Sequence, residues 1–219
     1  MKNIHIRNAW SLVLSLVMIL TMLPFGSYAE GATETPEQAV TTTLEYYQSV
    51  NNKNLASFWD TLAVYGAKEQ LRDGTWLLPV LEPGEDSSAS EYAAAILNEL
   101  AKGGRPESWI NALAAQQNGD GSFGDGTNNH IFAMIALDGG NGLYDRLAAI
   151  EWLAQQQFDN GGFSWGAGVE PDVDITGMAL IALGRYLGTG ATDAERDLAE
   201  PAVAAALDFL KGKQVSSGG

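Results

Sequence analysis

The sequence predicts an all-α protein built as an array of repeated helical hairpins. A short pattern occurs four times: Gln, three residues, Gly, one residue and an aromatic. The copies are Gln70-Gly74-Trp76, Gln117-Gly121-Phe123, Gln157-Gly161-Phe163 and Gln214-Gly218. Their glutamines are 47, 40 and 57 residues apart, a spacing typical of repeat arrays. The last copy reaches Gly219 before its aromatic, so we expect the array to continue beyond the printed sequence.

The first 29 residues have the features of a secretory signal peptide. Lys2 and Arg7 form a basic start, residues 9–23 are almost entirely apolar, and Ser27-Tyr28-Ala29 resembles a cleavage site. The alternative is an uncleaved anchor, but an apolar run of about 15 residues is shorter than the roughly 20 that span a bilayer. We predict that residues 1–29 are removed, that no transmembrane segment remains, and that the protein is secreted or attached to the cell surface.

The chain after this leader is strongly acidic and contains no cysteine. Because Lys2 and Arg7 leave with the leader, the net charge falls from −15 to −17. A negative field of this size disfavours nucleic acid and anionic lipid as partners, and it suits the solvated surface of an exported protein. The lack of cysteine excludes disulfides and thiolate zinc sites. We therefore expect no cofactor and no metal.

The first helices after the leader are predicted from capping and turn residues. Thr35-Pro36-Glu37 is a strong helix start, so residues 30–54 are expected to form a helical lead-in. The repeat array is predicted to cover residues 55–219 and to begin with a helix over residues 55–69. Pro, Gly and Ser mark residues 77–88 as a loop.

From residue 89 onward, two kinds of helix alternate. We expect helices over residues 89–102, 106–117, 128–138, 143–157, 173–188 and 193–213. One kind ends in the Gln motif, with a leucine one helical turn before the glutamine. The other kind follows the motif and is apolar nearly all round, so it should be enclosed on most sides. This alternation predicts two concentric layers, arranged as a solenoid or a closed ring.

The repeated motif is expected to stabilise the turn between two helices. Its Gly allows a sharp turn with positive φ. Its Gln amide can bond unpaired backbone groups at neighbouring helix ends. Its aromatic side chain packs back onto the hairpin. All of these roles are structural, and none of them requires chemistry.

The pattern resembles the Gln-Trp repeat of triterpene cyclases such as squalene–hopene cyclase. Trp152-Leu153-Gln157-Gly161-Phe163 matches that repeat except for its final Phe, whereas the copy at Gln70 has Gly66 where Leu is expected. The resemblance covers about residues 60–219. It implies the (α/α) toroid shared by terpenoid cyclases and protein prenyltransferases. The chain holds fewer hairpins than a closed toroid of that superfamily, so we expect a partial toroid or one truncated at the C-terminus.

The resemblance also provides two candidate catalytic residues, Asp172 and Asp174. Residues 171–175 (Pro-Asp-Val-Asp-Ile) are similar to the Asp-x-Asp-Asp-Thr motif of class II terpene cyclases, whose middle Asp protonates an alkene and maps onto Asp174. Here Ile replaces the third Asp, which removes one polar partner of that acid. The alternative is that the two carboxylates cap a helix, at the place that Asn128 and Ser88 occupy in earlier repeats.

Other candidate sites carry weaker signals. Residues 118–126 are similar to a calcium loop, but the Gly of its sixth position is replaced by Phe123, and a Gly-rich turn is the alternative. The prenyltransferase zinc site needs a Cys that the chain lacks, and His130 is expected to cap or pack. Six aromatics either line a hydrophobic cavity or belong to the core: Trp59, Trp76, Trp109, Trp152, Phe163 and Trp165.

The resemblance extends to toroid proteins that are not enzymes, the exported cobalamin carriers of vertebrates. Residues 174–179 are loosely similar to a stretch of their repeats. We therefore expect an exported α-toroid repeat protein that acts as a binding or scaffold domain. Its partners would be a small hydrophobic or cobalamin-like ligand, or cell-wall and other domains of the same longer protein. The alternative is a squalene-type cyclase-like isomerase that uses Asp174 as general acid.

Overall fold

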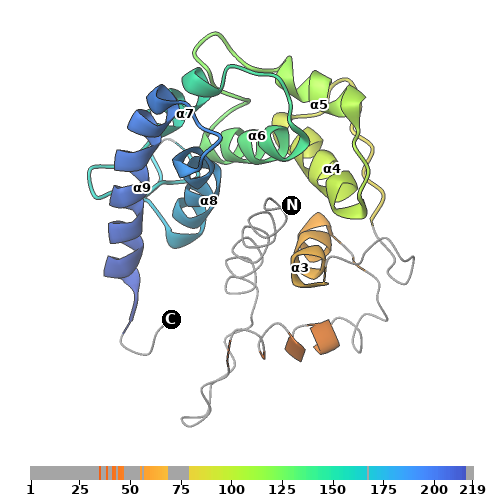
Figure 1. Cartoon of the computed structure of the whole chain (residues 1–219), viewed down its shortest axis with the longest axis horizontal. Coiled ribbons are helices and arrows are strands. Elements are labelled where there is room, and N and C mark those ends of the chain that lie inside the picture. Colours follow the sequence, from red (N-terminus) through yellow and green to blue (C-terminus); the bar gives the residue numbers. More distant parts are fainter. Residues whose placement is uncertain are drawn as a thin grey trace. The chain divides into compact units, whose positions relative to one another are not determined.

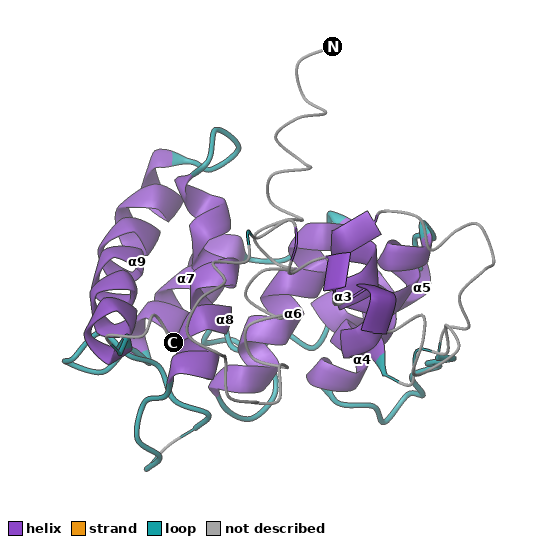
Figure 2. Ribbon diagram, turned by 90° about the horizontal axis from the view of Figure 1, so that it is seen from below, coloured by secondary structure: helices purple, strands orange, loops and turns teal. Residues whose placement is uncertain are grey.

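The structure is a computed structural model, and its described residues fall mainly in the second half of the chain. They are Thr35, Gln38, 41–42, 44–46, Leu55, 57–68, 79–166 and 168–215. Within these ranges all named elements are helical, and Figures 1 and 2 show helices joined by loops. The all-α prediction is thus confirmed. The predicted leader, the motif copy Gln70-Gly74-Trp76 and Gly218 lie outside the described residues.

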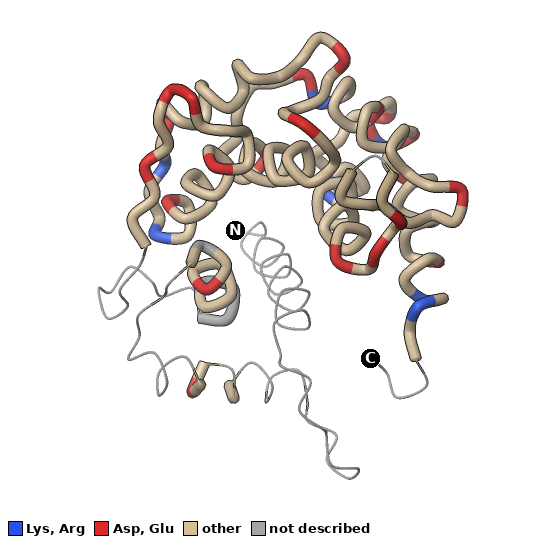
Figure 3. The backbone as a smooth tube through the Cα atoms, turned by 180° about the vertical axis from the view of Figure 1, so that it is seen from behind, with Lys and Arg blue, Asp and Glu red and all other residues tan. Residues whose placement is uncertain are grey.

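The chain divides into two compact units, which are described separately. One unit contains the residues up to Glu82 together with Leu97–Gly104, and the other contains Pro83–Ile96 and the residues from Arg105 onward. In the part of the chain that the structure describes, no helix is both long and apolar enough to span a bilayer. Acidic residues are spread along the described backbone and basic residues are sparse (Figure 3), as the composition requires.

The first unit contains α3 (Phe58–Lys68), which begins later than residue 55 because Ser57 caps it. The Ser57 hydroxyl accepts a hydrogen bond from Asp60 N at 3.3 Å, and Asp60 Oδ2 accepts one from Ser57 N at 3.0 Å. Such a reciprocal pair satisfies two backbone donors at a helix start. Leu62 and Val64 are buried, which anchors the helix in its unit.

The helices that follow α3 agree with the predicted order. They are α4 (Ala89–Lys102), α5 (Glu107–Ala114), α6 (Thr127–Gly140), α7 (Arg146–Gln155), α8 (Val173–Gly184) and α9 (Asp193–Lys213), with a 3₁₀ turn, η2 (Arg185–Leu187), after α8. The bounds of α4 and α9 match the predicted ranges. α5 and α7 end before their motif glutamines, because the chain turns there before the loop begins.

The helices of the second unit differ in burial as their sequences predict. α6 packs against α5, α7 and α8, and most of its residues are buried. α5 buries only Ile110 and Leu113, and α7 buries Ala149, Ile150 and Leu153. Figure 1 shows α6 and α8 adjacent, with α7 and α9 beyond them. Each large aliphatic side chain enclosed in this way stabilises the fold by roughly 1.5–3 kcal/mol.

The starts of α4, α7, α8 and α9 are fixed by side-chain caps. Ser88 accepts a hydrogen bond from Glu91 N, and Asp145 accepts one from Ala148 N. Asp172 caps α8, and Thr192 forms a full capping box with its partner three residues on. A cap of this kind contributes about 1 kcal/mol. These caps therefore set where each loop ends, and so where its side chains are placed.

Candidate functional site

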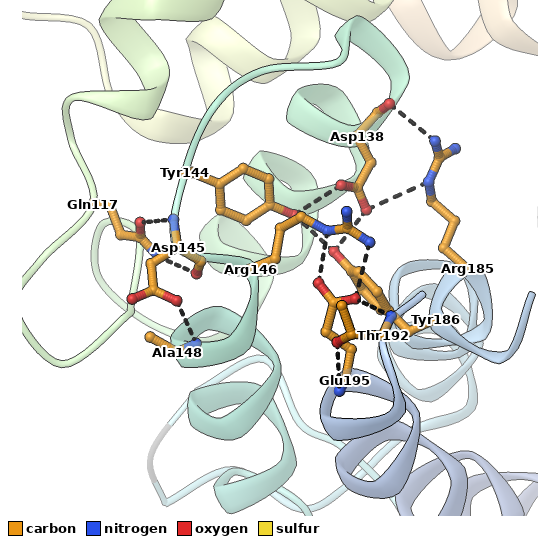
Figure 4. Close-up of polar contacts among 10 residues, drawn as sticks. All are labelled: Gln117, Asp138, Tyr144, Asp145, Arg146, Ala148, Arg185, Tyr186, Thr192 and Glu195. Carbon is orange, nitrogen blue, oxygen red and sulfur yellow. Dashed lines mark hydrogen bonds and ion pairs between the residues drawn. The ribbon is translucent and has the colours of Figure 1, made fainter. Parts of the chain in front are cut away.

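The glutamine of the second motif copy ties its own loop to the start of α7. Gln117 Nε2 donates to the carbonyl of Gly121 at 3.1 Å and to the carbonyl of Asp145 at 2.9 Å. Its Oε1 accepts a hydrogen bond from Asp145 N, also at 2.9 Å. Figure 4 shows this pairing beside the Asp145 cap on Ala148. The amide therefore satisfies backbone groups at a helix end, as the motif predicts.

The glutamine of the third copy makes the corresponding bonds to α9. Gln157 Nε2 donates to Gly161 O at 2.9 Å and to Ala202 O at 2.8 Å. We call this arrangement the glutamine staple: one side-chain amide that binds the motif glycine's carbonyl and a backbone carbonyl of α9 or of the α7 cap. The partner of the amide differs between the two loops. Asp145 is the N-cap residue of α7, whereas Ala202 lies inside α9, directly after Pro201. The staple thus joins neighbouring elements in both loops.

The motif glycines are required by their conformation and by close contact. Gly121 has φ +90° and Gly161 has φ +86°, a region that other residues rarely adopt. A Cβ on Gly121 would collide with the carbonyl of Ala148, and one on Gly161 would collide with that of Ala205. Each of these carbonyls lies three residues after the one that the staple binds. The two loops therefore dock on their helices in the same register.

The motif aromatics occupy equivalent buried positions. Phe123 and Phe163 are both fully buried. The backbone N–H of Phe123 donates to His130 Nδ1 at 3.1 Å, and that of Phe163 donates to Thr176 Oγ1 at 2.9 Å. His130 and Thr176 each lie in the first turn of the helix that follows the loop. In both copies, a side chain of the following helix thus binds the backbone N–H of the motif aromatic.

His130 is a structural histidine held between two backbone groups. Because its Nδ1 accepts from Phe123, its Nε2 carries the proton and donates to Ala149 O at 3.0 Å. Burial lowers the pKa of His130 to about 4, so the ring is neutral near pH 7. Its ring centroid lies 4.5 Å from that of Trp152. This surrounding leaves the imidazole no free nitrogen for a ligand.

The structure assigns different positions to the two candidate acids. Asp172 is the N-cap of α8, and its Oδ1 accepts from Ile175 N at 2.8 Å. Its backbone N–H donates to Phe163 O at 3.0 Å, which connects the cap to the motif loop. Asp174 is exposed in the first turn of α8, where a carboxylate complements the helix dipole. The acid role of Asp174 stays a prediction, but an acid that protonates an alkene needs an enclosed site.

The expected equivalence of the capping residues needs a correction. Asp174 and Asn128 are each the second residue of their helix, α8 and α6. Ser88, however, precedes α4, so it corresponds to Asp172 and not to Asp174. The predicted match of Ser88 with Asp174 was wrong by two residues, because α4 lacks the Ile-Ala-Leu run by which α6 and α8 were aligned. α6 has Gly126 as its N-cap and no side-chain cap.

A buried polar cluster, which the sequence analysis missed, connects the end of α6 to η2 (Figure 4). Tyr144 Oη donates to Asp138 Oδ1 at 2.9 Å, and Tyr186 Oη donates to Asp138 Oδ2 at 2.8 Å. The two hydroxyl oxygens are themselves 2.7 Å apart. Three oxygen contacts of this kind need three protons, and the two tyrosines supply only two while Asp138 is ionised. A protonated Asp138 would complete the ring.

Two arginines and a glutamate lie next to this cluster. Arg185 Nη2 donates to Asp138 O at 3.0 Å, and its Nε lies 3.4 Å from Asp138 Oδ2. Arg146 lies over the Tyr186 ring at 5.1 Å and pairs with Glu195 at 3.1 Å. Burial raises the pKa of Asp138 above its usual range, although hydrogen bonds from Tyr186 and the charge of Arg185 oppose this. One sequence signal existed: Asp138 is an acidic residue directly after the apolar run Ile131–Leu137.

The other predicted candidates lie in a turn, in the core or on the surface. In residues 118–126, Asp120 Oδ1 accepts from Ser122 N and from Ser122 Oγ, so the loop bonds within itself. The described part of the chain contains no group of three His, Asp or Glu placed to hold a metal ion. Phe163 belongs to the core, whereas Trp165 is 61% exposed. Gln214 follows the last turn of α9.

Comparison of the sequence with protein-family models and with curated proteins, and of the structure with solved structures, found no match. The functional argument therefore depends on the residues of this chain. The repeated loop residues bind backbone groups, and Asp172 binds a helix start. In the two motif copies that the structure describes in full, at Gln117 and Gln157, the repeated residues are thus engaged in holding helices together.

Proposed function

We propose that this chain is an exported repeat scaffold that binds a ligand or partner and performs no catalysis. The observation that carries the proposal is the glutamine staple, which is present in both loops. In each of them the side-chain amide of the motif glutamine is hydrogen-bonded to backbone groups. A catalytic repeat would instead direct its polar groups toward a shared cavity. The signal-like first 29 residues and the acidic remainder support a role outside the cell.

We further propose that the helices form a partial (α/α) toroid. The contrast between enclosed α6 and half-exposed α5 and α7 supports this, since a toroid has an inner and an outer layer. Candidate partners remain a small hydrophobic or cobalamin-like ligand, and cell-wall or other domains joined to the same protein. A fold of this kind does not by itself assign a function, so the ligand must be tested directly.

The alternative, a cyclase-like isomerase acting through Asp174, is tested by turnover. The exported chain is incubated with squalene in detergent micelles, and products are identified by gas chromatography with mass spectrometry. The proposal predicts no cyclised product from the wild type or from Asp174→Asn, and unfolding free energies that differ by no more than about 1 kcal/mol, the worth of the helix-dipole contact. A cyclised product that is made by the wild type and lost in Asp174→Asn would overturn the proposal.

Ligand binding is tested by the unfolding midpoint. A ligand present at about 100 times its Kd stabilises the folded chain by roughly 2.7 kcal/mol, which is readily measured as a shift in Tm. Cyanocobalamin is the probe for a corrinoid, and squalene is the probe for an apolar ligand. A Tm that rises with either probe supports the corresponding ligand. A Tm that neither probe changes disfavours both ligands, and other partners are then tested.

A further inference from the structure

We propose that a pocket beside the third motif loop binds a neutral saccharide, an inference that rests on the proposed binding function. The pocket has a volume of about 360 Å³ and lies between the start of α6 and the turn after α7. Its volume is at the lower end of the range of small-ligand pockets, about 300–1,000 Å³, and it opens widely to solvent, so a bound sugar would stay partly exposed. Its lining contains Thr127, Gln155, Gln156, Phe158, Asp159 and Ser164.

The lining favours a ligand with many hydroxyl groups. Gln155 and Gln156 offer amide groups, and Thr127 and Ser164 add hydroxyls. Gln156 Nε2 already donates to Trp152 O and Ser164 Oγ to Gly166 O, so these two side chains offer mainly their oxygen acceptors. Each sugar hydroxyl is both a donor and an acceptor, so these side chains match it in kind. Because Phe158 is the only large apolar side chain in the lining, a polyprene would leave polar groups unpaired. An apolar ligand is therefore disfavoured at this place.

The charges of the lining disfavour ionic ligands. Asp159 is its only ionisable residue, and neither Lys nor Arg takes part. An anion such as phosphate would be repelled by that carboxylate and by the acidic chain as a whole. A metal ion would require several carboxylates or imidazoles, and the described residues contain no such group. A neutral polar ligand remains.

Two exposed aromatic residues belong to this part of the surface. Phe158 lines the pocket and is 39% exposed, and Trp165, between the lining residues Ser164 and Gly166, is 61% exposed. Solvent-exposed aromatics of this size are candidates for contact with the apolar faces of a ligand, and they lose little conformational entropy on binding. The C–H face of a pyranose ring is such a surface. Aromatic faces beside amide groups therefore fit a saccharide.

The loop that carries these residues is held in place before any ligand binds. Gln157 staples it to α9, and Ser164 Oγ donates to Gly166 O at 2.9 Å. A Cβ on Gly126 would lie 3.3 Å from Trp165 O, so the loop backbone runs close to the start of α6. A preorganised loop spends little free energy on ordering when the ligand arrives.

The proposal is tested by titrating chitotriose and cellotriose, two neutral oligosaccharides, into the full chain. Binding is followed by isothermal titration calorimetry and by NMR shifts of the backbone amides. We expect saturable binding of at least one sugar with a Kd at or below about 1 mM, with shifts centred on residues 155–166. Trp165→Ala and Phe158→Ala are expected to weaken binding at least about tenfold, whereas Trp165→Phe keeps most of it.

The matched control is Leu143→Ala, because Leu143 is 91% exposed at the turn before α7 and does not line the pocket. It should leave the affinity unchanged. Trp165→Ala, Trp165→Phe and Leu143→Ala should keep the wild-type Tm, whereas Phe158→Ala loses some packing and is titrated well below its own Tm. Absence of binding by both sugars, or binding that neither aromatic substitution weakens, overturns the saccharide assignment. The scaffold proposal fails separately, through squalene turnover, so a chain that neither binds sugar nor turns over squalene loses the ligand assignment alone.

Discussion

The side chain of Gln117 pairs with the backbone of Asp145 through two hydrogen bonds, both 2.9 Å long. One side-chain amide thus forms hydrogen bonds with both the carbonyl and the N–H of a residue 28 positions away, as a backbone peptide group does with its partner in a β-sheet. Asp145 is also the N-cap of α7. The contact therefore connects the loop after α5 to the residue that starts the next helix of the same kind.

Removing a glutamine staple should lower the free energy of unfolding. Gln117→Ala leaves the Asp145 N–H and the Gly121 carbonyl without their side-chain partner, whereas the Asp145 carbonyl keeps its bond from Ala149 N. We expect a loss of about 1–3 kcal/mol in the free energy of unfolding. Gln157→Ala should lose a similar amount. Gln155→Ala is the matched control, because Gln155 is exposed and should change stability by less than about 0.5 kcal/mol. Urea unfolding measures all three, and equal midpoints would contradict the staple.

The motif glycines provide a second test, with a glycine control in the same loop. Gly121→Ala places a Cβ against the Ala148 carbonyl at positive φ, so we expect a loss of more than about 2 kcal/mol. Gly119→Ala meets no atom within 4 Å and should be neutral or slightly stabilising. Thermal unfolding of both variants checks this prediction. A Gly121→Ala protein as stable as Gly119→Ala would show that the loop does not dock as described.

His130 should make the stability depend on pH. Because its folded pKa of about 4 lies below the ordinary value of 6.5, the unfolded chain binds the extra proton between these pH values. The stabilisation is therefore complete above about pH 6.5 and is lost as the pH falls toward 4. The difference amounts to about 3 kcal/mol. His130→Gln should remove this dependence in urea titrations at pH 4 to 7, and an unchanged slope in that variant would refute the assignment.

Asp138 should act in the opposite direction. Burial raises its folded pKa above the ordinary 3.8, so its contribution is present at low pH and is lost as the pH rises through the folded value. Asp138→Asn keeps an acceptor for one tyrosine and a donor for the other. Asp138→Ala removes the carboxylate that accepts from both hydroxyls and pairs with Arg185 Nε, and it leaves only the contact between the two hydroxyls and the Arg185 bond to the backbone carbonyl. We expect it to cost about 2–4 kcal/mol more. Urea unfolding of both variants at pH 5 and pH 8 tests the ranking, which equal stabilities would contradict.

The predicted ranges 89–102 and 193–213 agree with α4 and α9, and local caps account for where these helices start. Thr192 with Glu195 fixes the start of α9, and Ser88 with Glu91 fixes that of α4. The role of the motif glutamine was also predicted from its chemistry. Its partner was not, since Ala202 lies 45 residues from Gln157 and is brought to it only by tertiary packing.

The buried cluster and the cap register could not be read from the sequence. Asp138 follows an apolar run, but nothing in the sequence pairs it with Tyr144 and Tyr186. The three residues meet only because α6 packs against α8, which η2 follows. Asp174 was placed with Ser88 because both are polar and precede apolar runs. The structure shows that the cap is Asp172, one place before the helix starts.

Amide hydrogen exchange at Asp145 tests the central claim of a glutamine staple most directly. In the wild type, the Asp145 N–H is bonded to Gln117 Oε1 and should exchange slowly. In Gln117→Ala that N–H should exchange at the rate of an open amide, while the Phe163 N–H, which donates to Thr176, should stay protected. An Asp145 amide that exchanges equally fast in both proteins would contradict the account.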